Sequence, residues 1–176
     1  MRPLIILTLL LLTACGTPSP NPTPPPPPST TPPQPTGLII RPGTVDAAMG
    51  LRVLDIQLTN HGPATTHING YPDIRILDKD RTPINATIGH GPNGITTGLQ
   101  HFDRPPQTIT LQPGQTAHAG LLWRNLVTET DRKATLGVYL TITPTPTAAP
   151  QTIEPDGGID LGNTTTLGLS PWTITP

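Results

Sequence analysis

The chain has 176 residues, with 10 Lys and Arg against 11 Asp and Glu, 26 prolines and one cysteine. Arg2 is the only charged residue before residue 37, so the chain from that point carries nine basic and 11 acidic side chains. A balance so close to neutral, with no basic stripe, excludes nucleic acid as an expected partner. A single cysteine excludes an internal disulfide, so packing must stabilise whatever part of the chain folds.

Residues 1–14 predict a lipoprotein signal peptide. Arg2 precedes an apolar run over residues 4–12, which is short for a membrane-spanning helix but typical of an export signal. The run ends in Leu-Thr-Ala-Cys, which matches the bacterial lipobox, although a plain secretory signal with an incidental cysteine is the alternative. We expect Cys15 to receive diacylglycerol and palmitate and to anchor the protein at the extracytoplasmic face of the cell membrane.

Residues 15–36, which begin with the cysteine expected to be lipidated, predict a disordered linker. There are 11 prolines between residues 17 and 36 and no charged side chain. Such a segment cannot bury apolar surface and favours an extended polyproline II conformation. We interpret it as a spacer between the membrane and a folded domain; a ligand for a proline-reading domain is the alternative.

Residues 37–176 predict one all-β domain, an antiparallel Ig-like β-sandwich. Frequent proline, glycine and threonine disfavour long helices. Apolar and polar residues alternate with the period of a strand in the segments 54–59, 108–111, 117–123 and 136–142. Turn signals separate these short runs, a pattern typical of sandwiches.

Three connections are predicted from the same pattern. Pro113-Gly114 suits a type II turn, and we expect it to join the runs on either side of it into a hairpin. The Gly-rich segment 88–106 is expected to be a long loop, which in a compact domain is usually functional or disordered. The Pro-rich segment 144–158 is expected to cross between the sheets.

The order of short motifs resembles a family. The segments "LTNHGPATTHINGYPDIRILD", "ITLQPGQTAHAGLLW", "ATLGVYLTITP" and "LGLSPW" follow one another as in the actinobacterial domain-of-unknown-function family DUF4232, over about residues 50–172. The residues that carry the resemblance are Asn60, Gly62, Gly70, Tyr71, Pro72, Pro113, Gly114 and Trp123. The resemblance implies a β-sandwich on a cell-envelope lipoprotein and supplies no established activity.

One position departs from that family. Its members often carry a cysteine near position 67 and a second one later, which implies a disulfide. This chain has His67 there and no later cysteine. We therefore interpret His67 as filling a structural position rather than a catalytic one.

The residue inventory leads us to expect a protein without enzymatic activity and without a cofactor. Two of the three serines, Ser19 and Ser29, lie in the linker, and Ser170 precedes a proline. No Gly-x-Ser-x-Gly or Ser-x-x-Lys motif occurs. Lipidation of Cys15 would remove the only thiol, and no phosphate-cradling glycine loop is present.

Two chemical alternatives stay open. His90, His101 and Asp103 share the long loop, and imidazole and carboxylate groups are common metal ligands, so an envelope metal-binding protein is the second hypothesis. Asp78 with Asp80, and Asp156 with Asp160, allow a carboxylate-dependent hydrolase as the third, although all four fit ordinary turns.

The preferred hypothesis is a binding module for an envelope protein, a peptide or a glycan. Phe102 lies in the long loop between His101 and Asp103-Arg104. An exposed aromatic ring beside an arginine is typical of binding hot spots. We therefore expect His101, Phe102, Asp103 and Arg104 to form the partner site, and we expect Trp123, on the inward phase of its strand, to belong to the core.

Overall fold

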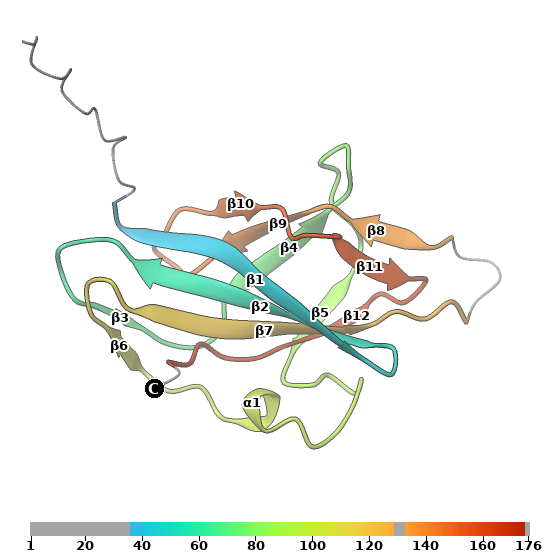
Figure 1. Cartoon of the computed structure of the whole chain (residues 1–176), viewed down its shortest axis with the longest axis horizontal. Helices are drawn as coiled ribbons and strands as arrows, with labels where there is room; N and C mark the ends of the chain where they lie inside the picture. The colour runs from blue at the N-terminus through green and yellow to red at the C-terminus, as the bar shows by residue number, and fades with distance from the viewer. Residues whose placement is uncertain (1–35, 129–132, 175–176) are drawn as a thin grey trace, which may run out of the picture. The chain divides into compact units, whose positions relative to one another are not determined.

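The computed structural model describes residues 36–128 and 133–174, which belong to one of the two compact units of the chain, Gln34–Pro176. Figure 1 shows this part as a set of strands with one short helix. The strands are β1 Leu38–Ala48, β2 Leu51–Asn60, β3 Thr66–Ile68, β4 Asp73–Leu77, β5 Thr87–His90, β6 Ile109–Leu111, β7 Thr116–Arg124, β8 Thr135–Gly137, β9 Tyr139–Thr143, β10 Gln151–Ile153, β11 Ile159–Gly162 and β12 Thr166–Leu169. The helix is α1, Gln100–Asp103.

The strands form a β-sandwich. One layer is a five-stranded sheet in the order β1-β2-β7-β12-β5, and opposite it lies a three-stranded sheet in the order β10-β9-β4. Two short pairs, β11 with β8 and β3 with β6, complete the described structure. Among these strands every pair is antiparallel except β12 with β5, so the expected antiparallel Ig-like sandwich is confirmed with one parallel edge.

Alternation along the two central strands builds one continuous core. On β2 the side chains of Leu54, Ile56 and Leu58 are buried, and they pair across the ladder with the inward side chains of β7. The expectation that Trp123 lies in the core is confirmed, because it is 1% exposed. Apolar residues of the facing strands β4, β9 and β10 belong to the same cluster, so burial of both inner faces holds the layers together.

Asn60, the last residue of β2, bonds to the turn that follows it and to the end of β6. Its side chain is 1% exposed and donates to the carbonyls of Ala64, at 2.8 Å, and Leu111, at 3.0 Å, while its Oδ1 accepts from the Gly62 N–H. The Gly114 N–H donates to the Asn60 carbonyl at 2.7 Å. The hydrogen-bonding groups of the buried amide are therefore satisfied, and Asn60 fixes the turns that follow β2 and β6.

The expected hairpin at Pro113-Gly114 is wrong, although a turn is present. Gly114 has a φ of +81°, and the Gln115 N–H donates to the Gln112 carbonyl, as a tight turn requires. However, β6 pairs with β3, whereas β7 pairs with β2 and β12. The turn therefore carries the chain from one sheet to another instead of joining neighbours.

Three segments also differ from the sequence interpretation. The expected strand over 136–142 breaks at Val138 into β8 and β9, which lie in different sheets. Leu136, which was expected to face the core, therefore lies outside it and is 50% exposed. The expected loop 88–106 contains most of β5 and all of α1. The expected crossover 144–158 contains β10, which pairs back onto β9. Pairing with a distant strand decided the positions of β8, which pairs with β11, and of β5, which pairs with β12, whereas β10 folds back onto its neighbour in sequence.

Candidate functional site

The two edges of the sandwich differ, and the more open one carries a groove. β4 is the edge strand of the three-stranded sheet and β5 is the edge strand of the five-stranded sheet. We call the space between them the open seam. A groove of about 450 Å³ lies there and is lined by Tyr71, Pro72, Asp73, Ile74, Ala86, Ile88, His90 and Leu169.

The Gly-Tyr-Pro motif forms one wall of the groove. Gly70 has a φ of +84°, a backbone conformation that favours glycine, and its carbonyl accepts a hydrogen bond from the Trp172 N–H at 3.0 Å. Pro72 restricts Tyr71 to an extended conformation. The Tyr71 side chain is therefore presented at the start of β4 by a backbone that is fixed on both sides.

His90 extends this wall from the side of β5. It is the last residue of β5, and its ring stacks on that of Tyr71 with 3.7 Å between the ring centroids and 3° between the planes. At the preceding position, a side chain on Gly89 would collide with Asn93, whose amide donates to the Leu167 carbonyl at 2.8 Å. The chain after β5 is thus held against β12.

The opposite edge of the sandwich is closed by one side chain. Gln151 on β10 accepts a hydrogen bond from the Ile40 N–H at 2.9 Å and donates one to the Leu38 carbonyl at 2.8 Å. Both partners lie on β1, so the glutamine bridges the two sheets. We call this edge the closed seam.

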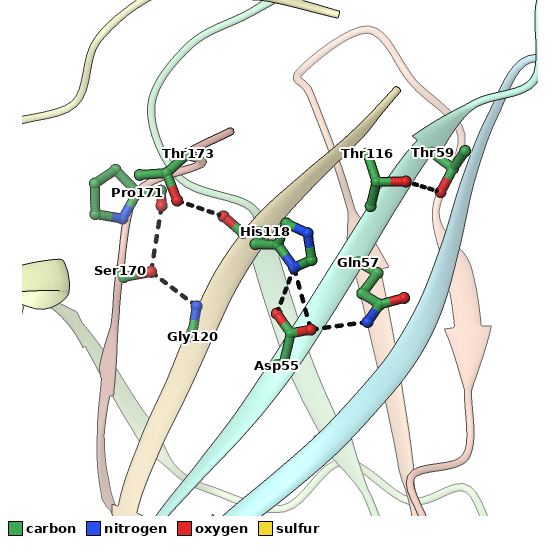
Figure 2. A network of polar contacts seen from close by, with 9 residues as sticks. All are labelled: Asp55, Gln57, Thr59, Thr116, His118, Gly120, Ser170, Pro171 and Thr173. Atoms are coloured by element: carbon green, nitrogen blue, oxygen red, sulfur yellow. Dashed lines mark hydrogen bonds and ion pairs between the residues drawn. The ribbon is translucent and has the colours of Figure 1, made fainter. Parts of the chain in front are cut away.

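A polar network lies on the outer face of the five-stranded sheet, as Figure 2 shows. His118 Nδ1 lies 3.0 Å from one carboxylate oxygen of Asp55 and 3.1 Å from the other, and Gln57 donates to the same carboxylate at 2.9 Å. About one third of the His118 side chain is exposed, and it is paired with Asp55. The polar phase of β2 and β7 suggested these residues, but only the strand register brings them together.

Ser170 is used structurally. It is 4% exposed, its Oγ accepts a hydrogen bond from the Gly120 N–H at 2.7 Å, and its own hydroxyl donates to the Pro171 carbonyl, as Figure 2 shows. The serine therefore fixes the chain after β12 against β7.

The expectation that Phe102 is an exposed anchor is wrong. Its side chain is 5% exposed, and a methyl group at Gly120 would lie 2.8 Å from its Cζ and 3.4 Å from Val53. The absence of a side chain at Gly120 leaves room for the ring on the outer face of β7. There Phe102 covers an apolar patch of the sheet that is separate from the main core.

The other three predicted partner-site residues are exposed. His101 and Asp103 lie on α1 and Arg104 follows it. Arg104 also lines a second groove, of about 460 Å³, together with Trp172, Thr173 and Ile109. Partner binding by these residues stays a prediction, but it would have to proceed without the Phe102 ring.

The proposed metal ligands do not form a metal site. Within the described residues, no group of three or more His, Cys, Asp or Glu side chains is arranged so that it could hold a metal ion. His90 stacks on Tyr71 at the open seam, whereas His101 and Asp103 belong to α1. Sharing a long loop did not bring the three side chains together, because the loop contains a strand end and a helix.

Of the predicted carboxylates, Asp78, Asp80 and Asp156 lie in turns, whereas Asp160 lies on β11. Asp78 Oδ1 accepts hydrogen bonds from the N–H groups of Asp80 and Thr82, at 2.9 and 2.8 Å. The Asp160 carboxylate bonds the side chain of Asn125. His67, on β3, is exposed, lies opposite Thr110 of β6 and bonds its hydroxyl at 3.1 Å, and its structural role stays a prediction.

Cys15 and the linker lie outside the described residues, so lipidation stays a prediction. In the part of the chain that the structure covers, no helix has the length and hydropathy that crossing a bilayer demands.

The domain is a β-sandwich, and the short sequence motifs lie at its turns and at its open seam. The model of the domain of unknown function DUF4232 matches residues 24–173, and the chain belongs to that family. No curated protein and no solved structure matches the chain.

Proposed function

We propose that this protein is a lipid-anchored protein of the cell envelope whose β-sandwich binds a partner and catalyses no reaction. The observation that carries the proposal is the groove at the open seam, with the stacked Tyr71 and His90 on its walls. Ligand sites are typically preformed hollows, and this one combines apolar side chains, among them Ile74, Ile88 and Leu169, with a larger share of polar surface, which suits a ligand that forms hydrogen bonds.

The rigidity of the surroundings supports a binding role. Ile74 and Leu169 are buried in the main core, so the base of the groove is part of the packed interior. Tyr71 is held through Gly70 and Pro72, and His90 through the chain after β5. A ligand would meet a surface that is already ordered, which lowers the entropy cost of binding.

The place where the linker joins the domain also supports display of the groove. The described chain begins at residue 36 and enters the sandwich through β1, a strand of the closed seam. The groove lies at the other seam. An anchor at Cys15 would therefore be attached at the edge that does not carry the proposed binding site.

The anchor is tested by replacing its only possible attachment atom. We expect the unaltered chain to incorporate labelled palmitate and to partition into detergent, and the Cys15→Ser variant to lose both properties. A Cys15→Ser protein that still partitions with detergent, or an unaltered chain without label, would overturn the anchoring part of the proposal.

The binding part is tested with two tyrosine variants. Full-length protein is used to capture components of an envelope extract, and Tyr71→Ala is compared with Tyr139→Ala, whose ring lies under the Arg81 guanidinium at 4.4 Å, away from the groove. We expect Tyr71→Ala alone to lose the captured component. Equal capture by both variants would remove the groove as the site, and no capture by the parent protein would remove the binding function.

A further inference from the structure

The backbone of β5 presents hydrogen-bonding groups to the open seam. The N–H groups of Thr87 and Gly91 donate to carbonyls of the chain at β12, at 2.7 and 2.8 Å. Successive residues of a strand direct their backbone groups to opposite sides, so those of Ile88 and His90 point away from β12. They therefore face the seam, where β5 is an edge strand.

β4 presents the same kind of edge from the other side. The Ile76 carbonyl is turned away from β9, because it accepts the N–H of Ile84 at 2.8 Å. Ile74 lies two residues earlier and has the same orientation. Ile84 covers Ile76, whereas Ile74 lines the groove. The groove is thus bordered by two edge strands whose outward backbone groups can pair with an added chain.

We propose that the open seam binds an extended peptide segment of a partner protein, which adds a strand beside β5. This inference rests on the proposed function and names its ligand class. In strand addition, main-chain hydrogen bonds supply affinity and pockets for alternate side chains supply specificity. β5 has four residues, about 13 Å of extended chain, so the added strand is short.

Charge and shape define the peptide further. Asp73 is the only carboxylate that lines the groove, and it makes no ion pair with the residues described in the structure. A basic side chain of the peptide would meet it at the rim. An apolar side chain two positions away in the strand, on the same face, would enter the groove over Ile74, Ile88 and Leu169.

The linker of this protein itself is a poor occupant. Eleven of its residues between 17 and 36 are prolines, which have no N–H group to donate to an edge strand. A glycan would use the stacked Tyr71 and His90 and would not need the backbone of β5. Only a peptide strand therefore requires the His90 N–H, whereas a glycan would require the His90 ring.

The test separates the His90 backbone from its side chain. A phage-displayed library of random dodecapeptides is selected on the full-length protein, and the enriched peptides are then measured as synthetic peptides against His90→Ala and His90→Pro. Both variants lose the imidazole, but only the proline variant also loses the N–H that faces the seam. Proline is tolerated at an edge position whose N–H points outward, so His90→Pro is expected to fold.

We expect enriched peptides to carry a basic residue followed by alternating apolar residues. His90→Ala should weaken their binding about threefold, and His90→Pro should weaken it a further tenfold or so, as expected for one main-chain hydrogen bond. Asp73→Asn should weaken binding a few-fold and reduce its dependence on salt. Methylation of alternate peptide amides should abolish binding when it falls on the edge that faces β5.

Three results would overturn the inference. The first is equal peptide binding by His90→Ala and His90→Pro, both of which must show the parent circular-dichroism spectrum. The second is binding of chitohexaose in the groove with no peptide enriched, which would retain a binding module but replace its ligand class. The third is that no peptide is enriched from the library, although the unaltered protein captures an envelope component and the Tyr71→Ala variant does not. Failure of the proposed function differs from all three, since then neither peptide, sugar nor extract component binds.

Discussion

The two seams of the sandwich solve the same problem in different ways. At the closed seam, the Gln151 side chain occupies the N–H of Ile40 and the carbonyl of Leu38, so two groups of β1 are satisfied within the protein. At the open seam, β4 and β5 do not pair with each other, and a groove with a stacked tyrosine and histidine lies between them. A single amide side chain can satisfy backbone groups of an edge strand, and where no such side chain is present those groups stay available to a partner.

The largest expected effect concerns the segment that leaves the open seam. Phe102 is buried on the outer face of the sheet, so Phe102→Ala should lower the free energy of unfolding by about 3 kcal/mol. Urea denaturation measures this loss, and amide hydrogen exchange should increase over residues 91–106 but not in β1. A loss below about 0.5 kcal/mol would mean that the ring is free, as the sequence had indicated.

The next effect is expected where β12 supports the chain after β5. A methyl group at Gly168 would lie 2.5 Å from the Gly91 carbonyl oxygen, which accepts the N–H of Leu169 at 3.0 Å. Gly168→Val should therefore displace this chain, widen the open seam and cost about 2 kcal/mol. Thr166→Val, at an exposed position of the same strand, is the control and should leave the melting temperature within a degree or two. Equal melting temperatures for both variants would contradict the packing at Gly168.

A smaller effect should follow from opening the closed seam. Gln151→Ala removes two hydrogen bonds to β1 and should cost about 1–2 kcal/mol, with faster amide exchange at Ile40. Gln151→Glu keeps the acceptor for Ile40 but places a carboxylate oxygen against the Leu38 carbonyl, so it should cost at least as much as Gln151→Ala. If neither substitution changes exchange in β1, Gln151 does not close this seam.

The smallest effect is expected at the Asp55–His118 pair, which belongs to neither seam. About one third of each side chain is exposed, so the interaction is partly screened by solvent. His118→Ala should therefore cost about 0.5 kcal/mol and should leave capture by the groove unchanged. A variant that folds normally but no longer captures the envelope component would move the binding site to the outer face of the sheet.

Local patterns predicted the strands better than their partners. The alternation in β2 and β7 correctly indicated which side chains face the main core, because a strand with one core face must alternate, but it missed Leu122, which is buried on the other face of β7. The pairing of β6 with β3 could not be read from Pro113-Gly114, since a turn fixes the direction of the chain and not the sheet that it joins. β1 was not predicted, because Pro42-Gly43 interrupts its pattern at an irregularity in the ladder.

The candidate site was not predicted from the sequence, which placed the partner site at residues 101–104. Gly70, Tyr71 and Pro72 were singled out as motif residues, and they form one wall of the groove. The contribution of His90 depends on the parallel pairing of β5 with β12, which no local pattern indicates. Phe102 was misplaced because the space that receives its ring is created by Gly120, on a strand distant in sequence.

The Gln151 bridge also bears on how the domain responds to mechanical load. Any tension that arrives from residues before Gly37 is applied first to Leu38, the residue whose carbonyl Gln151 holds. β1 continues from there along nine paired positions of β2, so the pull runs parallel to the strands and loads many hydrogen bonds at once in shear. A protein stretched between a bilayer and a bound partner would carry the same force at both ends, and β1 would receive its share through nine paired positions at once.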